Sequence, residues 1–72
     1  MRVRDVLALN LKGLRQIQNL SQEDLADLAG IDRTYVSSLE RSQYSATIDV
    51  LERLALALGV KPADLLTEPA SN

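Results

Sequence analysis

Apolar side chains near the start of the chain recur at the spacing of an amphipathic helix. Leu7, Leu11 and Leu14 follow one another at intervals of four and three residues, and Ile17 continues the series. Because a helix turns about 100° per residue, these intervals place the side chains along one face. The pattern predicts a first helix with this face turned toward the core of the protein.

Polar residues and glycines divide the rest of the chain into further helices. Ser21 is a favourable N-cap, and Asp24 three residues later completes a capping box with Asp in place of Glu. Leu25 and Leu28 are the apolar residues of this short helix, and Gly30 suits the left-handed residue that ends a helix. We therefore expect a second helix with both leucines pointing inward.

The same kinds of signal mark the helices closer to the C-terminus. Asp32 and Thr47 are N-caps, Gly59 suits a helix end, and Pro62 suits the first position of a helix. The residues expected to point inward are Val36, Leu39, Ile48, Leu51, Ala55 and Leu58. Together the patterns predict an all-α fold without strands, with helices over about residues 3–18, 21–29, 32–41, 47–58 and 62–66 and a flexible polar tail at 68–72.

Composition narrows the functions open to such a bundle. The 72 residues make one domain and include no Cys and no His, which removes disulfides, most zinc sites and the commonest general base. The sequence also has no glycine-rich phosphate loop. We therefore expect no enzymatic activity, no metal and no cofactor, and no separate domain remains to hold a small-molecule effector.

Hydropathy and charge bear on location and partners. The apolar runs are shorter than the roughly 18 residues of a membrane span, and the N-terminus has no signal-peptide pattern, so we expect a cytoplasmic protein without membrane contact. The net charge of −2 argues against nucleic acid, whose binders usually carry a basic surplus. However, Arg33 and Arg41 flank one segment, and a dipolar molecule can present a locally positive face.

The segment from Ser21 to Arg41, SQEDLADLAGIDRTYVSSLER, joins two short predicted helices at a single glycine. This order is typical of a helix-turn-helix motif, and the small Ala26 lets the two helices cross closely. The segment resembles the lambda-repressor-like family (Cro/repressor, XRE-type), and the resemblance extends over about residues 4–66. Its DRTYVSSLER portion further resembles restriction–modification controller proteins, although small phage repressors share much of this pattern. The resemblance implies a five-helix lambda-repressor-like bundle, with its helix-turn-helix at about 21–41, that binds an operator in double-stranded DNA.

In that family the helix after the glycine enters the major groove and reads base edges near its N-terminus. Four residues of the matching helix lie opposite Val36 and Leu39, at positions i, i+1, i+4 and i+5. The fork of an Arg suits guanine O6 and N7, and short hydroxyl side chains permit close approach of the backbone. The expected base-reading residues are Arg33, Thr34, Ser37 and Ser38, with packing in the helix crossing as the alternative for Ser37.

The resemblance also implies residues that grip the DNA backbone and a pair that joins two helices. Gln22 begins the second helix, where a side-chain amide and the helix N-terminus bind a phosphate. Arg15 and Glu40 occupy the positions of a structural ion pair that holds the first helix against the third. The other expected phosphate contacts are Tyr35, Arg41, Ser42, Gln43 and Tyr44.

A single DNA-binding domain of this size makes few contacts, and such domains gain affinity by binding as two-fold dimers to half-sites about one turn of DNA apart. A second apolar stripe on the fourth helix continues into the C-terminal helix. The expected homodimer interface comprises Val50, Leu54, Ala57, Val60, Leu65 and Leu66. The alternative is that the fourth helix is buried on both sides within one chain.

These observations predict a sequence-specific, dimeric transcription regulator that binds a pseudopalindromic operator and controls its own promoter. It would repress by occluding RNA polymerase, and it would activate if acidic residues of the second helix touched the polymerase. The competing function is a protein–protein interaction module, antitoxin-like or co-regulator-like, that uses the same fold without reading DNA. The net charge favours the module, whereas Arg33 and its short hydroxyl neighbours lack the large apolar anchors of such interfaces.

Overall fold

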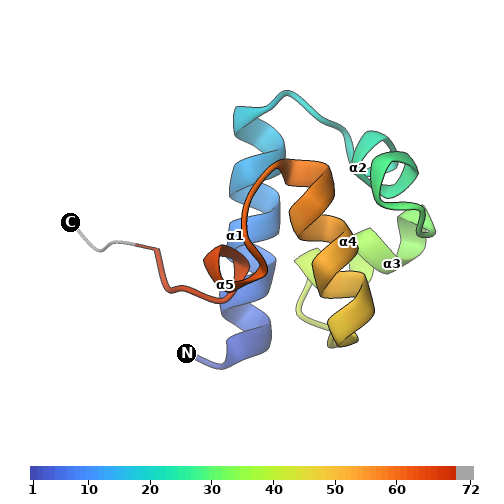
Figure 1. Cartoon of the computed structure of the whole chain (residues 1–72). Helices are drawn as coiled ribbons and strands as arrows, with labels where there is room; N and C mark the ends of the chain where they lie inside the picture. Colours follow the sequence, from blue (N-terminus) through green and yellow to red (C-terminus); the bar gives the residue numbers. More distant parts are fainter. Residues whose placement is uncertain (70–72) are drawn as a thin grey trace.

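A computed structural model describes residues 1–69, which form five α-helices joined by turns (Figure 1). The helices are α1 (Val3–Ile17), α2 (Gln22–Ala29), α3 (Arg33–Glu40), α4 (Ile48–Leu58) and α5 (Pro62–Leu65). The predicted all-α class is confirmed, because residues 1–69 contain no strand and each predicted helix begins and ends within one residue of the observed bounds. Of the predicted tail, residues 70–72 lie outside the described part of the chain. Within the described part, no helix is long and apolar enough to cross a membrane.

The five helices enclose one apolar core. α1 packs against α3 and α5, α4 packs against α2 and α5, and α2 packs against α3 (Figure 1). Every helix therefore contributes to the same core, and the position of α3 is fixed by contacts on two sides. The side chains with the least exposure come from all five helices and are Leu11, Leu25, Val36, Leu39, Leu54 and Leu65.

Local capping chemistry sets the helix boundaries in the predicted way. The Ser21 hydroxyl accepts from the Asp24 backbone N–H at 2.9 Å, and the Asp24 carboxylate accepts from the Ser21 N–H at 2.9 Å. The Thr47 hydroxyl accepts from the Val50 N–H at 3.1 Å. Gly30 ends α2 with a φ of 69°, a left-handed conformation that favours glycine. The predicted capping box and helix stop are therefore confirmed.

Three apolar residues expected in the core are exposed instead, so these predictions were wrong. Ile17, Leu28 and Ile48 are exposed to 77 %, 61 % and 84 %. Ile17 and Leu28 follow their apolar neighbours at intervals of three, and each such interval turns a side chain back by about 60° around the helix. Ile48 is the first residue of α4, whose buried residues begin only at Leu54.

One polar side chain ties α5 to α1. The Asn10 amide nitrogen donates to the carbonyl of Leu65 at 2.8 Å and to that of Thr67 at 2.9 Å, and it lies 3.3 Å from the carbonyl of Asp64. Carbonyls at the C-terminal end of a helix lack partners within the helix. Asn10 therefore caps a helix that is 54 or more residues away in sequence.

Candidate DNA interface

A short turn joins α2 to α3 and sets the angle between them. The Ile31 N–H donates to the Ala26 carbonyl at 3.0 Å, and the half-buried Ile31 side chain packs against the core. Asp32 then caps α3, because its carboxylate accepts from the Thr34 N–H at 3.1 Å. Ala26 is buried in α2, as expected for a helix that lies close to its neighbours. The predicted helix-turn-helix is thus present, with its turn held by backbone and capping bonds.

α3 turns one face to the core and leaves another at the surface. Val36 and Leu39 are buried, as predicted. Arg33 and Thr34 are exposed in the first turn of α3, and Ser37 is half-buried one turn later. The accessible face at the N-terminal end of α3 therefore consists of one guanidinium and short hydroxyl side chains.

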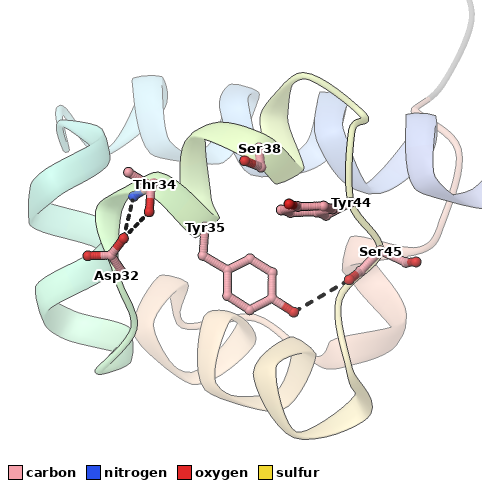
Figure 2. Close-up of a pocket in the computed structure, with 6 residues that line it drawn as sticks. All are labelled: Asp32, Thr34, Tyr35, Ser38, Tyr44 and Ser45. Carbon is pink, nitrogen blue, oxygen red and sulfur yellow. Dashed lines mark hydrogen bonds between the residues drawn. The ribbon is translucent and has the colours of Figure 1, made fainter.

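Ser38 is less accessible than the helix pattern predicts, since it is only 9 % exposed. The loop after α3 folds back beside it, and the Gln43 N–H donates to the Ser38 carbonyl at 2.9 Å. The tyrosines Tyr35 and Tyr44 lie on the same side (Figure 2). The expectation of an exposed Ser38 is therefore corrected: its side chain lines a hollow instead of projecting from the helix.

The hollow has a volume of about 510 Å³ and opens between α3 and the loop that follows it (Figure 2). The Tyr35 hydroxyl donates to the Ser45 carbonyl at 3.4 Å and so links α3 to this loop. The Thr34 hydroxyl donates to the Asp32 carboxylate, and this bond is the main reason why the pKa of Asp32 lies below its ordinary value. The lining residues are Asp32, Thr34, Tyr35, Ser38, Tyr44 and Ser45.

A largely buried polar network connects α1, α2 and α3. Arg15 Nε and Nη2 lie 2.8 and 3.0 Å from the two carboxylate oxygens of Glu40, and Arg15 Nη1 donates to the Leu20 carbonyl at 2.9 Å. The hydrogen bonds to Glu40 raise the pKa of Arg15 above its ordinary value. Gln22 joins the network through its amide nitrogen, which donates to Glu40 Oε1 at 3.2 Å. The structure thus brings Arg15 and Glu40 together as a two-point pair.

The residues after α3 differ in how they meet the rest of the chain. Arg41, Gln43 and Tyr44 are exposed and remain accessible to a ligand. Ser42 is half-buried with a φ of 58°, and its hydrogen bond to Asp5 is the main reason why the pKa of that carboxyl is lowered. Ser42 therefore faces α1, whereas its three neighbours face solvent.

The predicted dimer interface needs a correction. Leu54 and Leu65 are completely buried within one chain, so neither side chain is available to a partner. Each lies on a helix that packs against two others. For Leu54 the alternative prediction, burial of the fourth helix within one chain, is therefore correct. Val50, Ala57 and Val60 are half-buried against the same core, and only Leu66 of the predicted set is exposed.

Leu66 lines an apolar groove that the periodicity did not reveal. The groove has a volume of about 400 Å³ and lies between the start of α1, the start of α4 and the end of α5. Two of the exposed apolar residues, Val3 and Ile48, line it together with the half-buried Leu51. Its complete lining is Arg2, Val3, Arg4, Leu7, Ser45, Ala46, Ile48, Leu51 and Leu66.

The geometry of α2, the turn and α3 has counterparts in known proteins. A sequence profile of the helix-turn-helix family matches residues 11–65, which is more than half of the chain. The chain belongs to the helix-turn-helix family. The match includes all of α2, α3 and α4, so the family pattern covers the motif and the core that supports it.

Relatives within the helix-turn-helix family include regulators of restriction–modification systems. Control protein C.SmaI from Serratia marcescens is 43 % identical over 67 residues, which are 93 % of this chain and 80 % of that protein. A hypothetical transcription factor from Neisseria has a solved structure with a TM-score of 0.91 at 43 % identity, covering 94 % of this chain and 78 % of that one. The restriction–modification controller protein C.Esp1396I was solved as a tetramer with its natural 35 base-pair operator, and it matches with a TM-score of 0.81 at 31 % identity, covering 90 % and 86 %. The resemblance to XRE-type regulators and to controller proteins is therefore confirmed.

Proposed function

We propose that this helix-turn-helix chain is a homodimeric transcription regulator that reads an operator with α3 and controls its own promoter. The observation that carries the proposal is the accessible N-terminal end of α3, where Arg33 and Thr34 are exposed on a helix held by the core. Such an end fits the major groove, which admits an α-helix. The operator complex of C.Esp1396I supports DNA as the partner.

Base reading falls to the exposed residues of α3. Arg33 can place its guanidinium fork on guanine O6 and N7, the commonest specific contact in the major groove. Thr34 has its hydroxyl bonded to Asp32, which favours contact through its methyl group. Ser37 is short enough to let the α3 backbone approach a base edge. Ser38 is too buried to reach a base edge directly, and it contributes to base reading by lining the hollow.

Contacts with the DNA backbone would fix the position of α3. Gln22 uses one amide hydrogen toward Glu40, and the second hydrogen remains for a phosphate oxygen. Arg41, Gln43 and Tyr44 are exposed at the other end of α3 and can reach phosphates on its far side. The Ser42 backbone N–H already donates to the Leu39 carbonyl at 3.1 Å, so we propose a phosphate contact of Ser42 only after its hydroxyl leaves Asp5.

We propose the apolar groove as the homodimer contact. Val3, Ile48 and Leu66 expose apolar surface there, and burying such surface favours association. Arg2 and Arg4 line one side of the groove. On α4, the acidic residues Asp49 and Glu52 directly follow the lining residues Ile48 and Leu51 in the sequence. A two-fold axis through this region would bring the basic side of one copy toward the acidic side of the other.

Two further features follow from operator binding. A regulator of this kind acts where the chromosome and RNA polymerase are, so we propose a cytoplasmic location. Occlusion of the polymerase gives repression. Contact of the polymerase with exposed acids on α2, Glu23 and Asp27, gives activation.

The competing function, a protein–protein module, is favoured by one specific observation. The net charge of −2 makes overall attraction to DNA weak. However, the accessible end of α3 carries no large apolar anchor, and such anchors dominate the energetics of protein interfaces. We therefore keep the module as the second candidate.

Selection of bound duplexes from a random pool tests the proposal. We expect the wild-type chain to recover a two-fold-symmetric sequence, and Arg33→Ala to relax or lose the selected base at one position in each half-site. Lys12→Ala is the matched control, because it removes one exposed cation from α1 and changes the net charge equally. Both variants should keep the helical circular-dichroism spectrum of the wild type.

Two outcomes would contradict the proposal. Recovery of no preferred sequence at moderate salt would favour the protein–protein module. Equal effects of Arg33→Ala and Lys12→Ala on the selected site would mean that Arg33 acts only through net charge, which would remove it from base reading.

A further inference from the structure

The hollow beside α3 is unexpectedly apolar for a DNA-reading surface. Tyr35 and Tyr44 supply its largest side chains, and they are the only aromatic residues of the chain. They come from different segments, Tyr35 from α3 and Tyr44 from the loop after it, yet both line the same hollow (Figure 2). The guanine contact proposed for Arg33 and the phosphate contact proposed for Tyr44 do not use the apolar faces of the two rings.

Two of the hydroxyl groups around the hollow are hydrogen-bonded within the protein. The Tyr35 hydroxyl donates to the Ser45 carbonyl at 3.4 Å, and the Thr34 hydroxyl donates to the Asp32 carboxylate. What these two side chains can present to a ligand is therefore a ring surface and a methyl group. Ser38 lines the same hollow, and its small side chain leaves open a space that a longer one would fill.

We propose that this hollow receives the 5-methyl group of a pyrimidine on the major-groove edge of the operator, and that Tyr35 and Tyr44 thereby determine specificity. The inference rests on the proposed function. In the major groove the 5-methyl group is the apolar substituent of the base edges, and apolar side chains, the Thr methyl among them, recognise it by contact. Thr34, Tyr35 and Tyr44 provide such apolar surfaces beside Arg33, whose fork suits a guanine.

Two bases carry this group, and the hollow recognises what they share. Thymine has the methyl group by nature, and cytosine acquires it when a methyltransferase modifies C5. The volume of about 510 Å³ exceeds the needs of one methyl group, so the edge of the whole pyrimidine can enter. Loss of the methyl group should weaken binding about fourfold per half-site, the change that corresponds to burying one methyl group.

The experiment measures the dissociation constants of a series of operator duplexes. In one arm each thymine of the selected operator is replaced singly by deoxyuridine, which removes only the methyl group. In the other arm each cytosine is replaced singly by 5-methylcytosine, which adds it. Wild type, Tyr44→Phe and Tyr44→Ala are compared, and Tyr44→Phe is the matched control because it keeps the ring.

We expect one position per half-site at which loss of the methyl group weakens wild type and Tyr44→Phe about fourfold, while Tyr44→Ala responds little. A response in the deoxyuridine arm identifies thymine as the source of the group. A gain of about the same size in the 5-methylcytosine arm identifies modified cytosine. If Tyr44→Ala binds too weakly to measure, Ser38→Val tests the same idea, since a filled hollow should also erase the methyl dependence.

The inference would be overturned if neither arm changed the affinity at any position, or if Tyr44→Ala responded as strongly as the wild type. Either result leaves the proposed function intact when the chain still selects its operator from a random pool. Absence of any selected operator is the separate result that would defeat the proposed function itself.

Discussion

Arg15 of α1 and Glu40 of α3 face each other through two hydrogen bonds, 2.8 and 3.0 Å long, in a largely buried position. Two parallel bonds fix both the distance and the angle between a guanidinium and a carboxylate. Glu40 is the last residue of α3, so the pair fixes the end of the helix opposite to Arg33. The orientation of the proposed reading helix therefore depends on a contact far from the bases.

Removing one partner of this pair should strongly destabilise the fold. Arg15→Ala leaves the Glu40 carboxylate buried without its cation, and we expect a loss of about 3–5 kcal/mol in the free energy of unfolding. Arg15→Met combined with Glu40→Leu should recover most of this loss, because no charge is then buried. Urea unfolding at pH 7 measures the free energy of unfolding of the wild type, of Arg15→Ala and of the double variant. Arg41→Ala, which removes an exposed cation, is the control. A double variant as unstable as Arg15→Ala would contradict this account.

The capping box of α2 predicts a dependence of stability on pH. The pKa of Asp24 lies below its ordinary value of 3.8, because the carboxylate accepts hydrogen bonds from Ser21. A lowered pKa in the folded state adds stability that is complete above the unfolded value and is lost as the pH falls through the folded value. The wild type should thus exceed Asp24→Asn in stability at pH 7, and the difference should shrink below about pH 4.

Thermal unfolding between pH 2.5 and pH 7 measures this difference. Asp27→Asn is the control, since Asp27 is an exposed acid of the same helix that does not cap it. The explanation fails if the difference between wild type and Asp24→Asn stays constant across the whole range.

Local signals account for the features of the fold that the sequence predicts correctly. A capping box spans four residues, and a helix-ending glycine acts on its own φ, so Ser21 and Gly30 could be interpreted without knowledge of the rest of the chain. The same holds for the burial of Val36 and Leu39, because their interval of three residues places both on the core-facing side of α3. These elements rest on chemistry within one or two helical turns.

Long-range contacts account for the features that could not be predicted. The hollow needs Tyr44 from a loop whose path no periodicity describes, and the groove combines residues of α1 and α4 with Leu66, which follows α5. Apolar spacing shows that a helix has two apolar stripes but not which stripe its neighbours cover, so Leu54 was assigned to the dimer and Ile48 to the core. The role of Asn10 had no sequence signal at all, because a lone polar residue within a helix is usually solvated.

Asn10 should be required for the attachment of α5. Asn10→Asp replaces a donor by a carboxylate that faces the carbonyls of Leu65 and Thr67, and we expect a loss of about 1–3 kcal/mol. Asn10→Ala removes the bonds without adding a charge and should cost less. Urea unfolding gives the order of the variants, and hydrogen exchange of α5 amides should accelerate in both. Identical stabilities of Asn10→Asp and wild type would show that the three carbonyls find other partners.

The apolar groove predicts which surface substitutions abolish the dimer. Ile48 is 84 % exposed, so Ile48→Lys leaves the core of the monomer intact and changes its unfolding free energy by less than about 0.5 kcal/mol. In a dimer formed across the groove the same change buries an unpaired ammonium group, which opposes association. Sedimentation equilibrium should therefore show a monomer for Ile48→Lys, and its affinity for a two-fold operator should fall by at least tenfold.

The matched control for this prediction is Leu28→Lys. Leu28 is also an exposed apolar residue, but it lies on α2 and does not line the groove. The Leu28→Lys variant should therefore form the same dimer as the wild type. If instead Leu28→Lys gave the monomer and Ile48→Lys the dimer, the contact between copies would have to lie on the α2 side of the molecule. Since α2 belongs to the helix-turn-helix, such a dimer would cover part of the proposed DNA interface and would favour the protein–protein module.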